Sequence, residues 1–138
     1  MVYLVKQVEL AVRAQLDDLL RPAGITASQY TALTALERQA GLTSAQLARG
    51  SFVTAQSMAD MVTSLEEQGV ISRRRDPADR RRLVLSLTAR GRRLLERYRP
   101  KVAALEEQML GALSARQASD LRRYLLACRA GLADEPLD

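Results

Sequence analysis

The sequence predicts a mainly α-helical fold with one small β-hairpin. Leucine and alanine dominate a composition that is 47% hydrophobic and only 4% aromatic, which favours helices over a β-rich fold. Apolar residues recur at helical spacing along most of the chain and alternate in one short stretch, residues 83–87. With 138 residues, the chain has the length of one domain with a core of its own.

The first predicted helix is amphipathic and covers residues 2–20, before Pro22 and Gly24 end it. Its apolar residues follow helical spacing from the start of the chain: Leu4, Val5, Val8, Val12, Leu16 and Leu19. A terminal helix of this kind has little of its own domain to pack against. We therefore expect a partner subunit to cover it.

Three later helices begin with a capping box, in which a Thr or Ser and a Gln three residues later bond each other's backbone amides. The pairs are Thr26–Gln29, Thr43–Gln46 and Ser114–Gln117. The first of these helices is expected to reach Ala40 and to bury three residues: Tyr30, Leu33 and Leu36. The last is expected to end at Gly131 and to carry one apolar stripe: Leu121, Tyr124, Leu125 and Cys128.

Residues 43–69 predict a helix-turn-helix, two short helices joined by a tight turn. The first helix buries Leu47 and Ala48 and ends at Gly50 and Ser51. Thr54 then caps the second helix, which ends at Gly69. The second helix has an apolar face formed by Met58, Met61, Val62 and Leu65. Its opposite face carries four polar residues: Gln56, Asp60, Thr63 and Glu67.

An arginine-rich β-hairpin follows the second helix. Val70 and Ile71 begin one strand, and the other alternates through Leu83, Leu85 and Leu87. Asp76-Pro77 starts a turn between them, on a loop with six arginines: Arg73, Arg74, Arg75, Arg80, Arg81 and Arg82. Because these charges repel one another, we expect a polyanion to neutralise them. A solvated run of charge is the alternative.

The positive charge of the chain is local. The formal net charge is +5, and residues 73–99 hold eleven arginines against Asp76, Asp79 and Glu96, a balance of +8. The remaining residues therefore carry −3. A confined basic surface is typical of proteins that bind nucleic acid.

Composition excludes several classes of function. The chain has one cysteine and no histidine, which excludes an internal disulfide, a Cys/His zinc site and histidine-based catalysis. We expect no cofactor. No stretch reaches 18 consecutive apolar residues and the N-terminus lacks a signal-peptide pattern, so we expect a cytoplasmic protein. An enzyme is the weakest possibility, because the pairs Glu66–Glu67 and Glu106–Glu107 point to different sides of a helix.

The helix that follows the hairpin is long and is capped by Thr88. Pro100 lies inside it and removes one backbone hydrogen bond. We therefore expect a kink at Pro100, or a break into two helices.

These segments resemble the multiple-antibiotic-resistance regulator (MarR) family of winged-helix transcription factors. The resemblance rests on residues 47–49, 53–58 and 65–69, and above all on the wing motif Asp79, Arg81, Leu87 and Thr88. It covers nearly the whole chain. It implies a single domain with a winged helix-turn-helix at about residues 26–88 and N- and C-terminal dimerisation helices at about residues 1–20 and 95–132.

By this resemblance, the helix from Thr54 enters a DNA major groove with its N-terminal end foremost. Thr54 and Ser57 would contact phosphates or bases, and Gln56 would bond an adenine edge. Asp60 departs from the family, whose members often carry a basic or amide residue there. It could accept from a cytosine amine, repel the DNA backbone or pair with a nearby arginine. A purely capping Thr54 and a solvated Gln56 are the alternatives.

On the wing, Arg81 matches the family's minor-groove arginine, which narrow A·T-rich grooves attract. Asp79 is expected to hold the loop through an ion pair with a neighbouring arginine. The other five arginines are expected to meet phosphates, which position a protein without reading sequence: Arg73, Arg74, Arg75, Arg80 and Arg82.

The resemblance also implies a homodimer that binds a pseudo-palindromic double-stranded DNA operator and represses transcription. A small aromatic or anionic effector would release it, from a pocket that Tyr30 could line, with core packing as the alternative for Tyr30. We expect Cys128 to be a buried small hydrophobe, with a peroxide sensor as the alternative. A rival of another class is a winged helix used as a non-specific nucleic-acid-binding or protein-interaction module.

Overall fold

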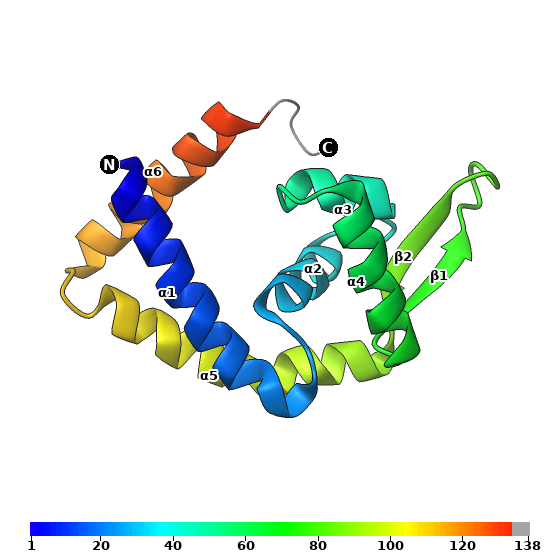
Figure 1. The fold of residues 1–138 in the computed structure, drawn as a ribbon, viewed down its shortest axis with the longest axis horizontal. Coiled ribbons are helices and arrows are strands. Elements are labelled where there is room, and N and C mark those ends of the chain that lie inside the picture. The colour runs from blue at the N-terminus through cyan, green and yellow to red at the C-terminus, as the bar shows by residue number, and fades with distance from the viewer. Residues whose placement is uncertain (134–138) are drawn as a thin grey trace. The chain divides into compact units, whose positions relative to one another are not determined.

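The computed structural model describes residues 1–133 and confirms a mainly helical fold with one hairpin (Figure 1). The elements follow one another along the chain as α1 (Val2–Leu20), η1 (Arg21–Ala23), α2 (Ala27–Arg38), α3 (Ser44–Gly50), α4 (Ala55–Glu67), β1 (Ile71–Arg75), β2 (Leu83–Leu87), α5 (Ala89–Leu110) and α6 (Ala115–Leu132). Internal contacts divide the chain into two compact units, Met1–Pro100 and the residues from Lys101 onward. No helix within residues 1–133 has both the length and the apolar character needed to cross a membrane.

All three predicted capping boxes are present. In each, the amide of the glutamine donates to the cap hydroxyl at 3.2 Å. The glutamine side chain accepts from the amide of the cap residue at 2.8 to 3.0 Å. Helix α2 ends at Arg38 rather than at the predicted Ala40, because Gln39 is already extended and Gly41 adopts a left-handed φ of 85°.

The core of the first unit lies between α2, α3, α4 and the base of the hairpin. The predicted inner residues of α2 and α3 are buried, as are Met58, Val62 and Leu65 of α4. Met61, predicted on the same apolar face, is only half-buried. The largest fully buried side chains of this unit are leucine, methionine and valine: Leu20, Leu33, Met58, Leu65, Leu85, Leu95, Val62 and Val70.

Strands β1 and β2 pair antiparallel, with Ile71 opposite Leu87 and Arg75 opposite Leu83. The predicted alternation is wrong at one end, since Leu83 is 45% exposed and Val84 is buried. Neighbouring residues of a strand point to opposite faces, so burial of both Val84 and Leu85 means that the hairpin base is covered on both sides. Leu83 lies beyond this cover, near the tip.

An isolated antiparallel bridge between Leu42 and Leu85 supports the hairpin. The amide of Leu85 donates to the carbonyl of Leu42 at 2.8 Å, and the amide of Gly41 donates to the carbonyl of Leu85 at 3.0 Å. The loop between α2 and α3 is thereby attached to β2. Within the first unit, the hairpin runs beside α4 and its tip projects away from the helices (Figure 1).

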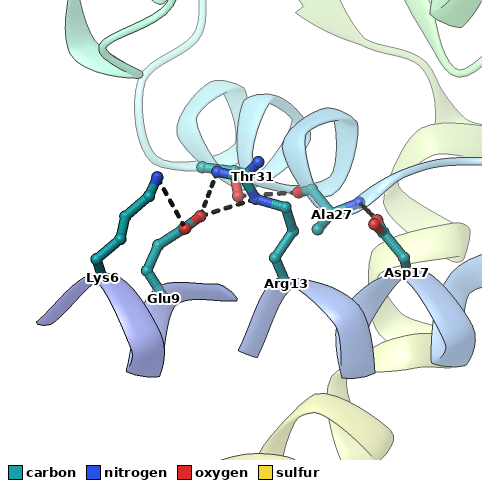
Figure 2. Close-up of polar contacts among 6 residues, drawn as sticks. All are labelled: Lys6, Glu9, Arg13, Asp17, Ala27 and Thr31. Atoms are coloured by element: carbon teal, nitrogen blue, oxygen red, sulfur yellow. Dashed lines mark hydrogen bonds and ion pairs between the residues drawn. The ribbon is translucent and has the colours of Figure 1, made fainter. Parts of the chain in front are cut away.

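A polar contact joins helix α1 to the start of α2. The carboxylate of Asp17 accepts from the amide of Ala27 at 2.7 Å and so satisfies one free N–H at the start of α2 (Figure 2). On the same side of α1, Glu9 pairs with Lys6 and with Arg13. Leu20 is the one residue of α1 that is buried, which agrees with the predicted lack of cover within the chain.

The start of α5 is joined to the elements before it by Thr88. Its hydroxyl donates to the carbonyl of Gly69 at 2.6 Å and accepts from the amide of Gly91 at 3.1 Å. Its own amide donates to the carbonyl of Val70 at 3.1 Å. Thr88 therefore caps α5 as predicted and also bonds the end of α4 and the start of β1.

Helix α5 continues from Ala89 to Leu110 through Pro100, so the alternative of two separate helices is wrong. Helix α6 contains no buried residue. The predicted burial of Cys128 is therefore wrong for the single chain, in which its side chain is exposed. The apolar stripe of α6 exists, but in the described protomer much of it remains in contact with solvent.

Gly91 provides a test of the α5–β1 junction. A Cβ at Gly91 would lie 2.1 Å from the carbonyl oxygen of Val70, so we expect Gly91→Ala to lower the free energy of unfolding by about 1–3 kcal/mol. Denaturant unfolding followed by circular dichroism measures this. Gly131→Ala is the matched control, because a Cβ there meets nothing within 4 Å. Wild-type stability in Gly91→Ala would contradict the close approach.

Candidate nucleic-acid interface

Helix α4 presents a polar face to solvent. Its apolar side is buried, whereas Gln56, Asp60, Thr63 and Glu67 are all exposed, as predicted. Thr54 caps the helix, since its hydroxyl accepts from the amide of Ser57 at 3.1 Å and donates to the Ser57 hydroxyl at 3.0 Å. The structure confirms the capping role of Thr54, and its contact with DNA stays a prediction.

The turn before α4 contains a residue whose conformation and exposure the sequence pattern does not predict. Phe52 adopts a φ of 55°, a left-handed conformation that is unfavourable for a side chain with a Cβ. Its ring is 57% exposed, although most phenylalanine side chains are buried. The amide of Val53 donates to the carbonyl of Ala48 at 3.1 Å and closes the turn. No glycine or asparagine marks this left-handed position in the sequence.

Gln56 and Asp60 form a pair on the exposed face of α4. The Gln56 Nε2 donates to Asp60 Oδ1 at 3.0 Å, as residues four apart on a helix can. Among residues 1–133, Asp60 forms no ion pair with an arginine, so that alternative is wrong. Its carboxylate is instead bound to the side chain that is expected to read a base.

Arg73 joins the wing to α4. It lies opposite Leu85 in the hairpin register, and its bonds to two residues of α4 place its side chain on the face of β1 that points to the helix. Its Nη2 donates to the Thr63 hydroxyl at 3.3 Å, and its Nε lies 3.3 Å from a Glu66 carboxylate oxygen. Both contacts are partly exposed, so we expect each to contribute less than about 1 kcal/mol. Their effect is to orient the hairpin against α4.

The tip of the wing is held by backbone hydrogen bonds to aspartate side chains. Asp76 Oδ1 accepts from the amide of Ala78 at 2.9 Å, and Asp79 Oδ1 accepts from the amide of Arg81 at 3.0 Å. Arg75 donates to the carbonyl of Arg80 at 2.8 Å and closes the loop from the strand. Asp79 thus shapes the loop as expected, but the predicted ion pair with an arginine is wrong.

The six wing arginines fall into two groups. Arg73 and Arg75 are already bonded within the wing or to α4, and the predicted projecting loop is shorter than expected because residues 73–75 belong to β1. The remaining guanidinium groups form no hydrogen bond or ion pair with any other residue that the structure describes: Arg74, Arg80, Arg81 and Arg82. These four exposed cations are available to a polyanion.

Tyr30 is a core residue of α2. It is 9% exposed, and burial raises the pKa of its hydroxyl, although the nearby Arg99 opposes that rise. Arg99 is paired with Glu37 at 2.7 Å, and this pairing raises the Arg99 pKa. The geometry therefore favours core packing for Tyr30.

The second unit contains an open groove of about 510 Å³ between α6 and the end of α5. It is lined by apolar residues together with charged ones, among them Met109, Leu125, Arg122 and Arg129. No cluster of three or more residues able to hold a metal ion occurs within the described part of the chain.

The comparisons with known proteins agree with this geometry. Residues 23–82 match the model of the MarR family. The chain is 35% identical to the HTH-type transcriptional repressor Rv2887 of Mycobacterium tuberculosis over 89% of this chain and 88% of that protein. The crystal structure of Rv2887 in complex with DNA is similar at a TM-score of 0.73, with 32% identity over 93% of this chain and 96% of that one.

Rv2887 has also been crystallised with salicylic acid. That structure is similar at a TM-score of 0.74, with 34% identity over 93% of this chain and 95% of that one. Three observations support one assignment: an exposed polar helix, an arginine wing held beside it and similarity to these relatives along most of the chain. The protein therefore belongs to the MarR family of winged-helix transcriptional regulators.

Proposed function

We propose that this protein is a cytoplasmic homodimeric repressor that binds a pseudo-palindromic double-stranded DNA operator. One observation carries the proposal: the exposed polar face of α4 and four unpaired guanidinium groups belong to elements that Arg73 holds together. A helix flanked by a basic hairpin fits a major groove with its neighbouring phosphates. No catalytic activity or cofactor is part of the proposal.

The recognition helix supplies the base contacts in this proposal. Gln56 faces solvent near the N-terminal end of α4, where it can reach a base edge, and the Ser57 hydroxyl can still donate to a phosphate. Thr54 contributes chiefly by capping the helix. The other backbone amides of the first turn have no partner within the helix and are available to a phosphate.

The wing supplies charge. We assign Arg81 to the minor groove and the other free arginines, Arg74, Arg80 and Arg82, to phosphates. Arg73, Arg75 and Asp79 act by shaping the wing, since their side chains are engaged within the protein.

The dimer is supported by apolar surface that the single chain leaves exposed. On α1, side chains such as Val2, Tyr3 and Leu4 are 84%, 73% and 60% exposed. On α6, Tyr124 and Leu125 are 57% and 50% exposed. A second copy would cover such faces, and two-fold symmetry would place the two recognition helices about 34–36 Å apart.

A small aromatic acid is the effector class that we propose. The support is the structure of the related Rv2887 with salicylic acid. Such a ligand could release DNA by favouring a conformation of the dimer in which the two recognition helices no longer match successive major grooves.

Gel shifts with the DNA upstream of the protein's own gene test the proposal against a non-specific or protein-interaction module. A specific regulator should bind the target about 10³-fold or more tightly than random duplex at the same salt concentration. Equal affinity for both duplexes would favour the non-specific module, and no binding at low salt would exclude both DNA-binding readings.

Arg81→Ala tests the wing. Loss of one cation from the minor groove, where the negative potential of the DNA is concentrated, should weaken operator binding and lower the slope of log K against log salt concentration by about one. Fluorescence anisotropy titrations at several salt concentrations measure both quantities. Arg21→Ala removes an exposed arginine that pairs with Asp18 at the end of α1 and should leave the slope unchanged. A wild-type slope in Arg81→Ala would contradict the assignment.

Salicylate tests the effector class. At saturation it should raise the Kd for the operator by about five- to 150-fold, the usual range of coupling between two sites. Acetate at the same ionic strength is the control, because it carries the carboxylate without the ring. An operator affinity that salicylate does not change would count against this effector class while leaving DNA binding intact.

A further inference from the structure

We propose that Asp60 determines base specificity by fixing the side-chain amide of Gln56, so that the pair selects adenine over guanine at one position of each half-site. The inference rests on the proposed DNA binding and adds a role for a residue that does not itself touch the base. Gln56 is the reading residue, and Asp60 is its positioning residue.

The hydrogen bond between the two side chains sets the orientation of the Gln56 amide. Nε2 donates to Asp60 Oδ1 at 3.0 Å. Rotating the amide by half a turn would place Gln56 Oε1 against the carboxylate, and two acceptors repel. Asp60 therefore selects one of the two amide orientations before DNA arrives, and it restricts a flexible side chain that is otherwise exposed to solvent.

The fixed amide matches adenine. Nε2 carries two hydrogens, and only one of them is used by Asp60. The outer edge of the amide then offers one donor and one acceptor, which complement N7 and the N6 amine of adenine in the major groove. Guanine presents two acceptors there, N7 and O6, so it would face the Gln56 carbonyl without a hydrogen to share.

The charge of Asp60 adds a second effect. Its carboxylate is exposed and has no arginine partner among residues 1–133, so a phosphate backbone nearby is repelled. This repulsion acts on every sequence, whereas the bond to Gln56 acts only where adenine is present. Asp60 therefore weakens binding to unrelated DNA while it sharpens the preference for the operator.

Three variants separate the hydrogen bond from the charge. Asp60→Ala removes both. Asp60→Asn removes the charge and keeps a hydrogen bond, but its amide can either accept from Gln56 Nε2 or donate to Gln56 Oε1, so it no longer selects one orientation. Glu67→Gln removes one exposed negative charge at the far end of α4 and serves as the control for charge alone. Gln56→Ala identifies the position that Gln56 reads. Each protein is used full length, and thermal melting verifies its folding.

The experiment selects duplexes from a randomised library and then measures binding of each protein to the selected duplex and to its single A·T to G·C variants. For the wild type, we expect adenine to be preferred at the Gln56 position by about fivefold or more. Asp60→Ala and Asp60→Asn should both lose most of this preference and bind random duplex more tightly than the wild type does, whereas Glu67→Gln should keep the preference.

The possible failures are distinguishable. If the wild type selects no sequence, the proposed function itself is wrong. If the wild type selects a motif but Asp60→Ala shows the same adenine preference, or if Gln56→Ala changes no position, the positioning role is overturned. If Asp60→Asn keeps the wild-type preference, a partner that only accepts is not required, and if Glu67→Gln loses the preference, charge alone is responsible. Either result overturns the proposal.

Discussion

The structure depends on the hydrogen bonds of one threonine. Thr88 bonds the carbonyls of Gly69 and Val70 and the amide of Gly91, so the end of the recognition helix, the first wing strand and the start of α5 meet at a single residue. This close approach is possible because Gly91 has no Cβ that would clash with the Val70 carbonyl. The hairpin therefore leaves the helical core at a fixed place, directly after the helix that it accompanies.

From this junction the wing is stiffened by polar contacts rather than by a core. Its base is covered by apolar residues, but its tip relies on Asp76 and Asp79, which bind backbone amides, and on Arg75, which binds a backbone carbonyl. These bonds oppose the mutual repulsion of the arginines. Four guanidinium groups then remain free, and the shape that presents them is already set before DNA binds, which reduces the ordering cost of association.

The recognition helix is likewise ordered before DNA binds. Its N-cap, the amide of Gln56 and its link to the wing each use a side-chain hydrogen bond that is complete without DNA. Thr63 and Glu66 hold Arg73, and Asp60 holds Gln56, so acidic and hydroxyl residues of α4 orient the arginine that positions the wing and the amide that we propose reads a base. An acidic residue on a DNA-facing helix has a physical role here, although its charge alone opposes binding.

The sequence by itself determined the elements that depend on local chemistry. Capping boxes, helical periodicity, the glycine stops and the Asp79–Arg81 wing motif act over a few residues, and they were sufficient to place the helices, the hairpin and the family. Only the tertiary structure decided which arginines are free, that Val84 rather than Leu83 is buried, and that Cys128 is exposed in the protomer. These outcomes depend on which surfaces meet across the fold, and periodicity shows only that a face is apolar, not what covers it.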